Sequence, residues 1–263
     1  MDLFNMIAGF AVGLLVGITG VGGGSLMAPI LILLLGVAPI TAVGTDLWFA
    51  AITKSVGGFI HHRHRGTDGG PDFQIVRRLC YGSLPAAALT LWLLARTDTH
   101  AIQSGLILHL LGAVLLLTAL ATLLRPRMQR AAIRMRARSA ARFTHLQAPL
   151  TVAAGALLGG MVTLTSVGAG ALGAVILFAL YPLRLTTRKL VATDIVHAVP
   201  LTLVGGLGHL SLGNVDLSLL GGLLLGSIPG IIAGAVFASR TSDRILRPML
   251  ALVLVATGVR LLL

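Results

Sequence analysis

The stretch Thr19-Gly20-Val21-Gly22-Gly23-Gly24-Ser25 interrupts the first long apolar segment of the chain. Its four glycines within five residues disfavour a continuous helix, because each glycine costs roughly 0.5–1 kcal/mol relative to alanine in a helix. In the hydrocarbon region of a membrane, non-helical backbone is tolerated only where protein buries it or where it lines a wet cavity. The stretch therefore predicts a broken membrane helix with a functional site at the break.

A second stretch, Thr165-Ser166-Val167-Gly168-Ala169-Gly170-Ala171, carries small or hydroxyl residues at the same spacing in the other half of the chain. One glycine cluster alone is explained equally well by close helix packing, since small residues let backbones approach. Two breaks at corresponding positions of two halves instead indicate a binding site at the repeat interface of a transporter.

The composition excludes an ordinary soluble protein, because 56% of the 263 residues are hydrophobic and the mean hydropathy is +0.96. Further apolar runs are each about long enough to span a bilayer. They cover residues 41–60, 79–95, 101–124, 189–211, 215–238 and 246–263. We therefore expect an all-α polytopic membrane protein.

The net charge of +12 raises the question of nucleic-acid binding. The arginines lie between apolar segments without interleaved aromatic residues, so membrane topology accounts for them and we expect no nucleic-acid partner. The single cysteine, Cys80, excludes an intramolecular disulfide. We also expect no metal site and no cofactor, since the chain has no glutamate, no cysteine pair and no convincing set of histidines with carboxylates.

Other motifs recur in the same order in both halves, which indicates an internal repeat. We predict a first transmembrane repeat over residues 1–124, an arginine-rich linker over 125–148 and a second repeat over 149–263. The matching motifs are Gly44-Thr45-Asp46 with Ala192-Thr193-Asp194, Val56-Gly57-Gly58 with Val204-Gly205-Gly206, and Gly82-Ser83-Leu84-Pro85 with Gly226-Ser227-Ile228-Pro229.

The segment after the first break, residues 25–36, is too short to span a bilayer, which favours a re-entrant hairpin. Each half then crosses three times, so the second half is inverted. This topology places 17 of the 20 lysines and arginines in the cytoplasm, with the linker inside and both termini in the periplasm. The linker itself suits an amphipathic helix at the membrane surface. Two short spans in place of each hairpin give the same sidedness, and the sequence leaves that alternative open.

Inverted hairpins aim the N-termini of two helices, near Ser25 and Ala171, at one central volume. Helix N-termini present unpaired N–H groups and a partial positive charge, so the site is expected to favour a small anion. Hydroxyl groups add hydrogen-bond donors, although they also bond to the carbonyl groups of their own helix in many membrane proteins. The candidate hydroxyl residues are Thr19, Ser25, Thr165 and Ser166.

Three ionisable residues, Asp46, Lys54 and Asp194, lie well inside apolar spans, where charges are costly and usually mark a pathway or a pair. We predict that Lys54 faces Asp194, either to bind the anion or as an architectural ion pair. Asp46 has no cation opposite it in this arrangement, which makes it the candidate proton carrier. His197 lies one turn from Asp194 and is expected to bond to it or to face the cavity.

The remaining histidines carry less information. His61, His62 and His64 lie among arginines and are expected to be solvated at the cytoplasmic membrane edge, while His209 is expected at a membrane interface.

The chain resembles the TauE/SafE family of membrane permeases, also called the 4-toluene sulfonate uptake permease family. The resemblance rests on the first glycine box, on Ala42-Val43-Gly44-Thr45, on Gly213-Asn214-Val215-Asp216 and on the duplication of this layout. The chain departs from the commoner family pattern at Thr45-Asp46, at Thr193-Asp194 and in the second box.

The resemblance implies a transporter of small sulfur-containing anions, such as sulfite or organosulfonates, in the bacterial inner membrane. The implied substrate-binding residues are Thr19, Gly20, Gly22, Gly23, Gly24 and Ser25 in the first box, and Thr165, Ser166, Gly168 and Gly170 in the second. A membrane enzyme acting on an anionic lipid and an anion channel are the alternatives. An enzyme requires a nucleophile or metal ligands beside a base, which the sequence lacks. The oligomeric state stays open, with a homodimer as one candidate.

Overall fold

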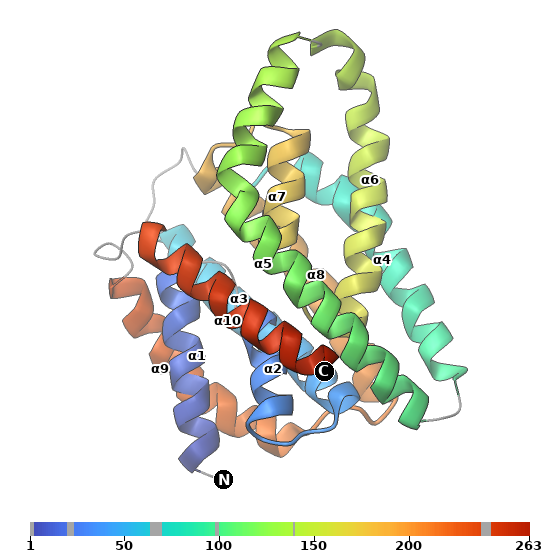
Figure 1. The fold of residues 1–263 in the computed structure, drawn as a ribbon, viewed down its shortest axis with the longest axis vertical. Coiled ribbons are helices and arrows are strands. Elements are labelled where there is room, and N and C mark those ends of the chain that lie inside the picture. The colour runs from blue at the N-terminus through green and yellow to red at the C-terminus, as the bar shows by residue number, and fades with distance from the viewer. Residues whose placement is uncertain (1–2, 20–23, 64–69, 98–99, 139, 238–242) are drawn as a thin grey trace.

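The computed structural model describes the chain except for residues 1–2, 20–23, 64–69, 98–99, 139 and 238–242 (Figure 1). The described part is helical and contains no strand. Its helices are α1 (Leu3–Thr19), α2 (Gly24–Leu33), α3 (Pro39–Arg63), α4 (Phe73–Ala95), α5 (His100–Arg138), α6 (Ala140–Thr165), α7 (Ala171–Leu180), α8 (Thr187–Ser211), α9 (Leu217–Phe237) and α10 (Asp243–Leu262).

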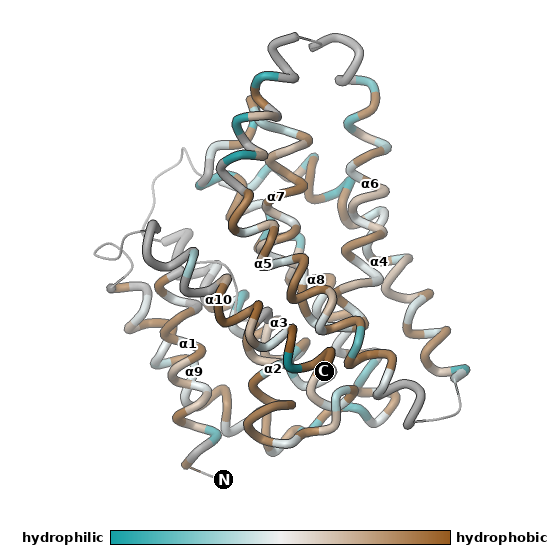
Figure 2. The backbone as a smooth tube through the Cα atoms, viewed as in Figure 1, coloured by the Kyte–Doolittle hydropathy of each residue, from teal (hydrophilic) through white to brown (hydrophobic). Residues whose placement is uncertain are grey.

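The prediction of an all-helical membrane protein is confirmed. Five helical stretches of the described part are long and apolar enough to cross a membrane, and shorter apolar helices accompany them. Figure 2 shows apolar residues along most of the helices, with hydrophilic residues near the outer ends of α5 and α6. The five long stretches are Phe73–Ala95, Gly105–Leu124, His145–Thr165, Arg188–Ser211 and Leu217–Gly234.

The second glycine-containing stretch separates two helices, as predicted, whereas most of the first lies outside the described residues. α1 ends at Thr19 and α2 begins at Gly24, and residues 20–23 lie outside the described part. At the second break α6 ends at Thr165 and α7 begins at Ala171. The short helices α2 and α7 have 10 residues each, so neither spans a bilayer alone.

The second break has an unusual backbone conformation. Ser166, Gly168 and Gly170 have φ angles of 57°, 124° and 139°, a region that glycine adopts without steric cost. Ser166 is the one described residue other than glycine with a positive φ. Such a conformation costs energy for an L-residue with a side chain, and it clusters at functional sites.

The predicted linker is not a separate surface helix. α5 continues through 39 residues to Arg138, and α6 begins at Ala140, so residues 125–148 extend two long helices beyond the apolar stretch of α5. Alanine and arginine are strong helix formers, which explains the continuation. The adjoining ends of α5 and α6 lie at one end of the molecule and the start of α1 at the other (Figure 1). Arg127, Arg130 and Arg134 are exposed.

The most extensive helix contacts join α1 to α9 and α4 to α6. Glycines make these contacts close. A Cβ atom added at Gly13 would collide with the backbone of Ser227, and one added at Gly159 would collide with the backbone of Ser83. Backbone packing through small residues is a common source of stability for helix pairs in membranes. The first helix of each predicted repeat thus packs against the other repeat.

Two threonine hydroxyls join the two predicted repeats in matching ways. The backbone N–H of Asp216, just before α9, donates to Thr45 Oγ1 of α3 at 3.0 Å. The backbone N–H of Asp72, just before α4, donates to Thr193 Oγ1 of α8 at 2.9 Å. Thr45 and Thr193 belong to the duplicated Thr-Asp motif, so one motif builds both contacts.

Candidate functional site

A cluster of buried polar side chains, called the central site here, lies between α3, α8 and the second break. α3 and α8 pack against each other. α3 contributes Asp46 and Lys54, and α8 contributes Asp194 and His197. Their exposed fractions are 0%, 4%, 7% and 1%. The structure thus brings together the four ionisable residues that the sequence singled out.

Lys54 reaches across to the second break. Its Nζ atom donates a hydrogen bond to the carbonyl oxygen of Ala169 at 2.8 Å. The carboxyl groups of Asp46 and Asp194 both lie within electrostatic range of the ammonium group. Lys54 therefore interacts electrostatically with Asp194, as expected, and also binds a backbone carbonyl that the sequence did not indicate.

Asp46 is the most deeply buried carboxyl group of the central site. It lies near the Ser166 hydroxyl and the backbone N–H of Ala28, but within the described residues neither of its oxygens makes a hydrogen bond of normal geometry. Lys54, on the same helix, is within electrostatic range of Asp46. Eight residues separate the two side chains, which is about two turns of α3.

Asp194 approaches the first turn of α7. Its Oδ1 atom occupies the space that a Cβ atom would take at Gly173. Asp46 lies near Ala28 in the corresponding part of α2. Both carboxyl groups therefore contact the N-terminal half of a short helix, where negative charge is favourable. From the sequence we predicted that these helix ends face a substrate anion. In the structure, two carboxyl groups of the chain itself lie there.

The candidate hydroxyl groups differ in what they contact. Thr165 Oγ1 donates to the carbonyl oxygen of Met161 at 2.6 Å and accepts from the N–H of Val167 at 3.2 Å. Thr165 thus bonds to its own helix end, the alternative considered above, and stabilises the break. The buried Ser166 hydroxyl lies near the Asp46 carboxyl group and makes no hydrogen bond of normal geometry within the described residues.

Several predicted site residues lie outside the part that the structure describes. These are Gly20, Gly22 and Gly23, the side chains of Thr19, Ser25, His61 and His62, and all of His64. Gly24 is the first residue of α2, and Gly168 and Gly170 shape the second break.

His197 pairs with a residue that the sequence did not connect to it. One ring nitrogen, Nε2, lies 2.9 Å from Ser83 Oγ of α4. The other, Nδ1, is buried without a hydrogen-bond partner among the described residues. The sequence feature that could have indicated this contact is the duplicated Gly-Ser-x-Pro motif. In it, Gly82 permits close packing against α6, and Ser83 faces α8.

His209 lies in the last turn of α8, near the end of its apolar stretch, and its expected place at a membrane interface stays a prediction. Its side chain is fully buried, and its Nε2 atom lies 2.9 Å from the carbonyl oxygen of Thr163. It ties α8 to α6 close to the second break.

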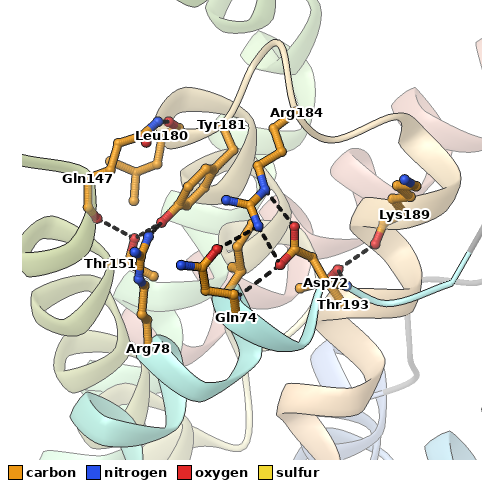
Figure 3. Close-up of polar contacts among 11 residues, drawn as sticks. Asp72, Gln74, Arg78, Gln147, Thr151, Leu180, Tyr181, Arg184, Lys189 and Thr193 are labelled. Atoms are coloured by element: carbon orange, nitrogen blue, oxygen red, sulfur yellow. Dashed lines mark hydrogen bonds and ion pairs between the residues drawn. The ribbon is translucent and has the colours of Figure 1, made fainter. Parts of the chain in front are cut away.

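A second polar cluster, called the end cluster here, lies where α4, α6 and the α7–α8 turn meet (Figure 3). Arg184 donates to both carboxylate oxygens of Asp72, at 2.7 and 3.0 Å. Arg78 donates to the Tyr181 hydroxyl at 3.0 Å, and the Thr151 hydroxyl lies 2.7 Å from the same oxygen. More than 100 residues separate Arg184 from Asp72 and Arg78 from Tyr181, so no local pattern revealed these pairs.

No group of metal-ligating side chains occurs within the described residues.

Comparison with known proteins gives consistent matches over nearly the whole chain. The family described as Sulfite exporter TauE/SafE matches residues 5–261. The probable membrane transporter protein YjnA of Bacillus subtilis (strain 168) is 36% identical over 263 residues, which cover all of both chains. The probable membrane transporter protein YdhB of the same organism is 26% identical over 253 residues, covering 96% of this chain and 97% of YdhB. No solved structure matches. Family and relatives are described as exporters or transporters rather than enzymes.

Proposed function

Because the chain belongs to the sulfite exporter TauE/SafE family of membrane transporters, we propose that it moves small sulfur-containing anions across the bacterial inner membrane by alternating access. Sulfite and small organosulfonates are the proposed substrates. The family's description names sulfite export, and the polar groups at the centre of the molecule suit a small anion.

One observation carries this proposal: a buried lysine of one repeat reaches the broken helix of the other. Lys54 is 4% exposed, and its ammonium donates to the carbonyl oxygen of Ala169. Transporter sites typically form at discontinuous helices on the interface of two repeats. The buried ammonium of Lys54 and the buried hydroxyl of Ser166 are donors that an oxyanion can use. Ser166 is the described hydroxyl that we assign to the substrate.

We further propose that transport is coupled to protons through Asp46. The central site holds one ammonium and two carboxyl groups, so an arriving anion would leave two uncompensated negative charges if both carboxyl groups were ionised. A charge surplus of this kind is costly in a buried site. Asp194 contacts the first turn of α7, where negative charge is favourable. Asp46, whose oxygens have no hydrogen-bond partner of normal geometry within the described residues, is the better proton carrier.

The proposed topology is an inverted repeat with the α5–α6 connection in the cytoplasm and both termini in the periplasm. Its support is that contacts between the two halves occur in matching pairs. The contact of α1 with α9 corresponds to that of α6 with α4. The hydrogen bond between Thr45 and Asp216 corresponds to that between Thr193 and Asp72. A two-fold axis relating the halves produces such pairs of contacts. The charge distribution described above supports the sidedness.

Substrate-induced thermal stabilisation of the purified protein tests the proposal. Sulfite, sulfoacetate, taurine, sulfate, phosphate and chloride are compared on the wild type and on Lys54→Ala. We expect one sulfur-containing anion to raise the melting temperature of the wild type selectively, and Lys54→Ala to lose that shift. No shift with any anion, or an equal shift in both proteins, contradicts an anion site at Lys54. Saturable counterflow in proteoliposomes then separates a transporter from a channel.

Proton coupling requires a separate measurement. We expect Asp46→Asn to abolish the pH dependence of uptake in proteoliposomes and to retain anion binding, because the amide mimics the protonated carboxyl group. Asp194→Asn is the matched comparison, and it is expected to weaken anion binding by disturbing Lys54. Unchanged pH dependence in both variants overturns the coupling.

A further inference from the structure

The position of the Lys54 ammonium resembles that of a bound metal cation. It is held by a backbone carbonyl oxygen of the break between α6 and α7, that of Ala169, at 2.8 Å. Two carboxyl groups, Asp46 and Asp194, lie within electrostatic range. His197 is also within range of the ammonium. A monovalent positive charge thus contacts a carbonyl oxygen at the break between two helices, with two carboxyl groups in electrostatic range.

In secondary transporters, the carbonyl oxygens of unwound helices together with nearby oxygen ligands commonly bind the coupling Na⁺. Alkali cations and ammonium groups carry the same charge and both prefer oxygen ligands. We propose that the Lys54 ammonium takes the place of a coupling Na⁺ as a built-in cation, so that the wild-type protein neither binds nor requires Na⁺. This inference rests on the proposed function, because it concerns the coupling of the same site.

The second repeat offers an internal comparison. When the duplicated Thr-Asp motifs are aligned, Lys54 of α3 corresponds to Thr202 of α8. Thr202 is uncharged, and its hydroxyl donates to the carbonyl oxygen of Ala198 in its own helix at 2.8 Å. The ammonium is therefore a feature of one repeat, and Lys54→Thr substitutes the residue that the other repeat already carries in a buried helix.

If the ammonium acts as a built-in cation, removing it leaves a position beside the Ala169 carbonyl oxygen, with two carboxyl groups in electrostatic range, that a free alkali cation can fill. The measurement is the melting temperature of the purified full-length protein at constant ionic strength, in NaCl against choline chloride. Both salts supply chloride, and choline is too large for the position. We expect the same melting temperature for the wild type in both salts. Lys54→Thr should be less stable than the wild type in choline and should gain roughly 3–6 °C in saturating Na⁺.

A second variant and a double variant sharpen the test. Lys54→Gln keeps an N–H donor for Ala169 and adds an amide oxygen, so it should also respond to Na⁺. Lys54→Thr combined with Asp194→Asn should lose the response, since one carboxylate is gone. Equilibrium binding of radioactive Na⁺ should rise from none in the wild type to one site per chain in Lys54→Thr.

The inference is overturned if neither single variant gains stability selectively in Na⁺, including the case in which both fail to fold in either salt. It is also overturned if Na⁺ stabilises the wild type or raises its affinity for sulfite. Sulfite binding by the wild type in choline medium separates the two proposals. If the wild type binds sulfite but the stability of the variants does not depend on Na⁺, only the inference of a built-in cation is overturned. If the wild type binds neither sulfite nor another anion, the proposed function is contradicted.

Discussion

Arg184 and Asp72 form a bidentate ion pair between the α7–α8 turn and the start of α4, with N–O distances of 2.7 and 3.0 Å. Asp72 also accepts from the N–H of Ile75 at 3.3 Å and thereby caps α4. One carboxylate thus orders the beginning of a membrane helix and fixes it to a turn of the other predicted repeat.

Replacing Arg184 should weaken this connection only modestly. The Arg184 side chain is 45% exposed and that of Asp72 is 16% exposed, and solvent-exposed ion pairs contribute about 0.2–1 kcal/mol. We expect Arg184→Gln to lower the free energy of unfolding by about 0.5–1 kcal/mol at low salt and by less at high salt. Thermal unfolding at both salt concentrations measures this, with Arg188→Gln as the control for loss of an exposed positive charge. A loss that is equal in both variants would argue against the ion pair.

The matching threonine contacts should contribute independently. Thr45→Val and Thr193→Val each keep the shape of the side chain but leave one N–H group, of Asp216 or Asp72, without its acceptor. We expect each variant to lose about 1 kcal/mol of stability, and the double variant to lose the sum because the sites are separate. Thr257→Val is the control, since the Thr257 hydroxyl donates to its own helix. A double variant no less stable than either single one would show that the contacts are coupled.

Helix contacts through glycine predict opposite results at two helical positions. A Cβ atom at Gly159 meets the backbone of Ser83, whereas one at Gly221 has open space around it. We expect Gly159→Ala to destabilise the protein by about 1–3 kcal/mol, because two helix backbones must separate. Gly221→Ala should be neutral or stabilising by up to about 1 kcal/mol, through the higher helix propensity of alanine. Chemical denaturation in detergent distinguishes them, and similar stability of the two variants would contradict the packing of α4 on α6.

Asp216 should make stability depend on pH in the acid range. It lies just outside the apolar stretch of α9, and the backbone N–H of Leu219 and the hydroxyl of Ser218 lower the pKa of its carboxyl group below the ordinary value of 3.8. A lowered pKa in the folded state means that the stabilisation is complete well above pH 3.8 and is lost as the pH falls through the folded-state pKa.

The test compares the melting temperatures of the wild type and Asp216→Asn between pH 7 and pH 3. Asp216→Asn should be less stable at pH 7, where only the wild type has the charged cap, and the difference should shrink toward pH 3. A difference that stays constant across this range would indicate that the cap acts without its charge.

Much of the fold followed from patterns that repeat along the chain. The apolar runs and the two breaks were predictable because lipid requires continuous helices and glycine or left-handed residues interrupt them. Only the interpretation of the arginine-rich stretch as a separate surface helix was wrong, because the charge that suggests a membrane surface is equally compatible with extension of α5.

The central site was predictable in its residue types but less so in its contacts. Burial cost alone selected Asp46, Lys54 and Asp194. It did not predict that Lys54 binds the Ala169 carbonyl or that His197 meets Ser83, since these contacts depend on how helices far apart in the chain cross. The periodicity of one helix predicts which of its faces is buried. Which other helix packs on that face depends on the arrangement of the whole bundle.

Ser166 allows backbone conformation and hydroxyl chemistry to be separated at the second break. Its φ of 57° suits glycine, and its buried hydroxyl lies near Asp46 without a hydrogen-bond partner among the described residues. Ser166→Gly relieves the backbone and removes the hydroxyl, while Ser166→Ala removes the hydroxyl and keeps the backbone cost. We expect Ser166→Gly to be more stable than Ser166→Ala by about 1 kcal/mol.

Anion affinity should follow the hydroxyl rather than the backbone. If Ser166 donates to the substrate, both variants should bind the preferred anion about tenfold more weakly than the wild type, equivalent to about 1.4 kcal/mol. Titration of thermal stability with that anion measures the affinity of all three proteins. Weak binding by Ser166→Gly alone would mean that the fixed backbone of the break positions the anion, and unchanged affinity in both variants would remove Ser166 from the binding site. Both variants lack the hydroxyl and differ only by a methyl group. A difference in stability between them therefore reports the cost of the left-handed backbone, and their common loss of affinity relative to the wild type reports the hydroxyl.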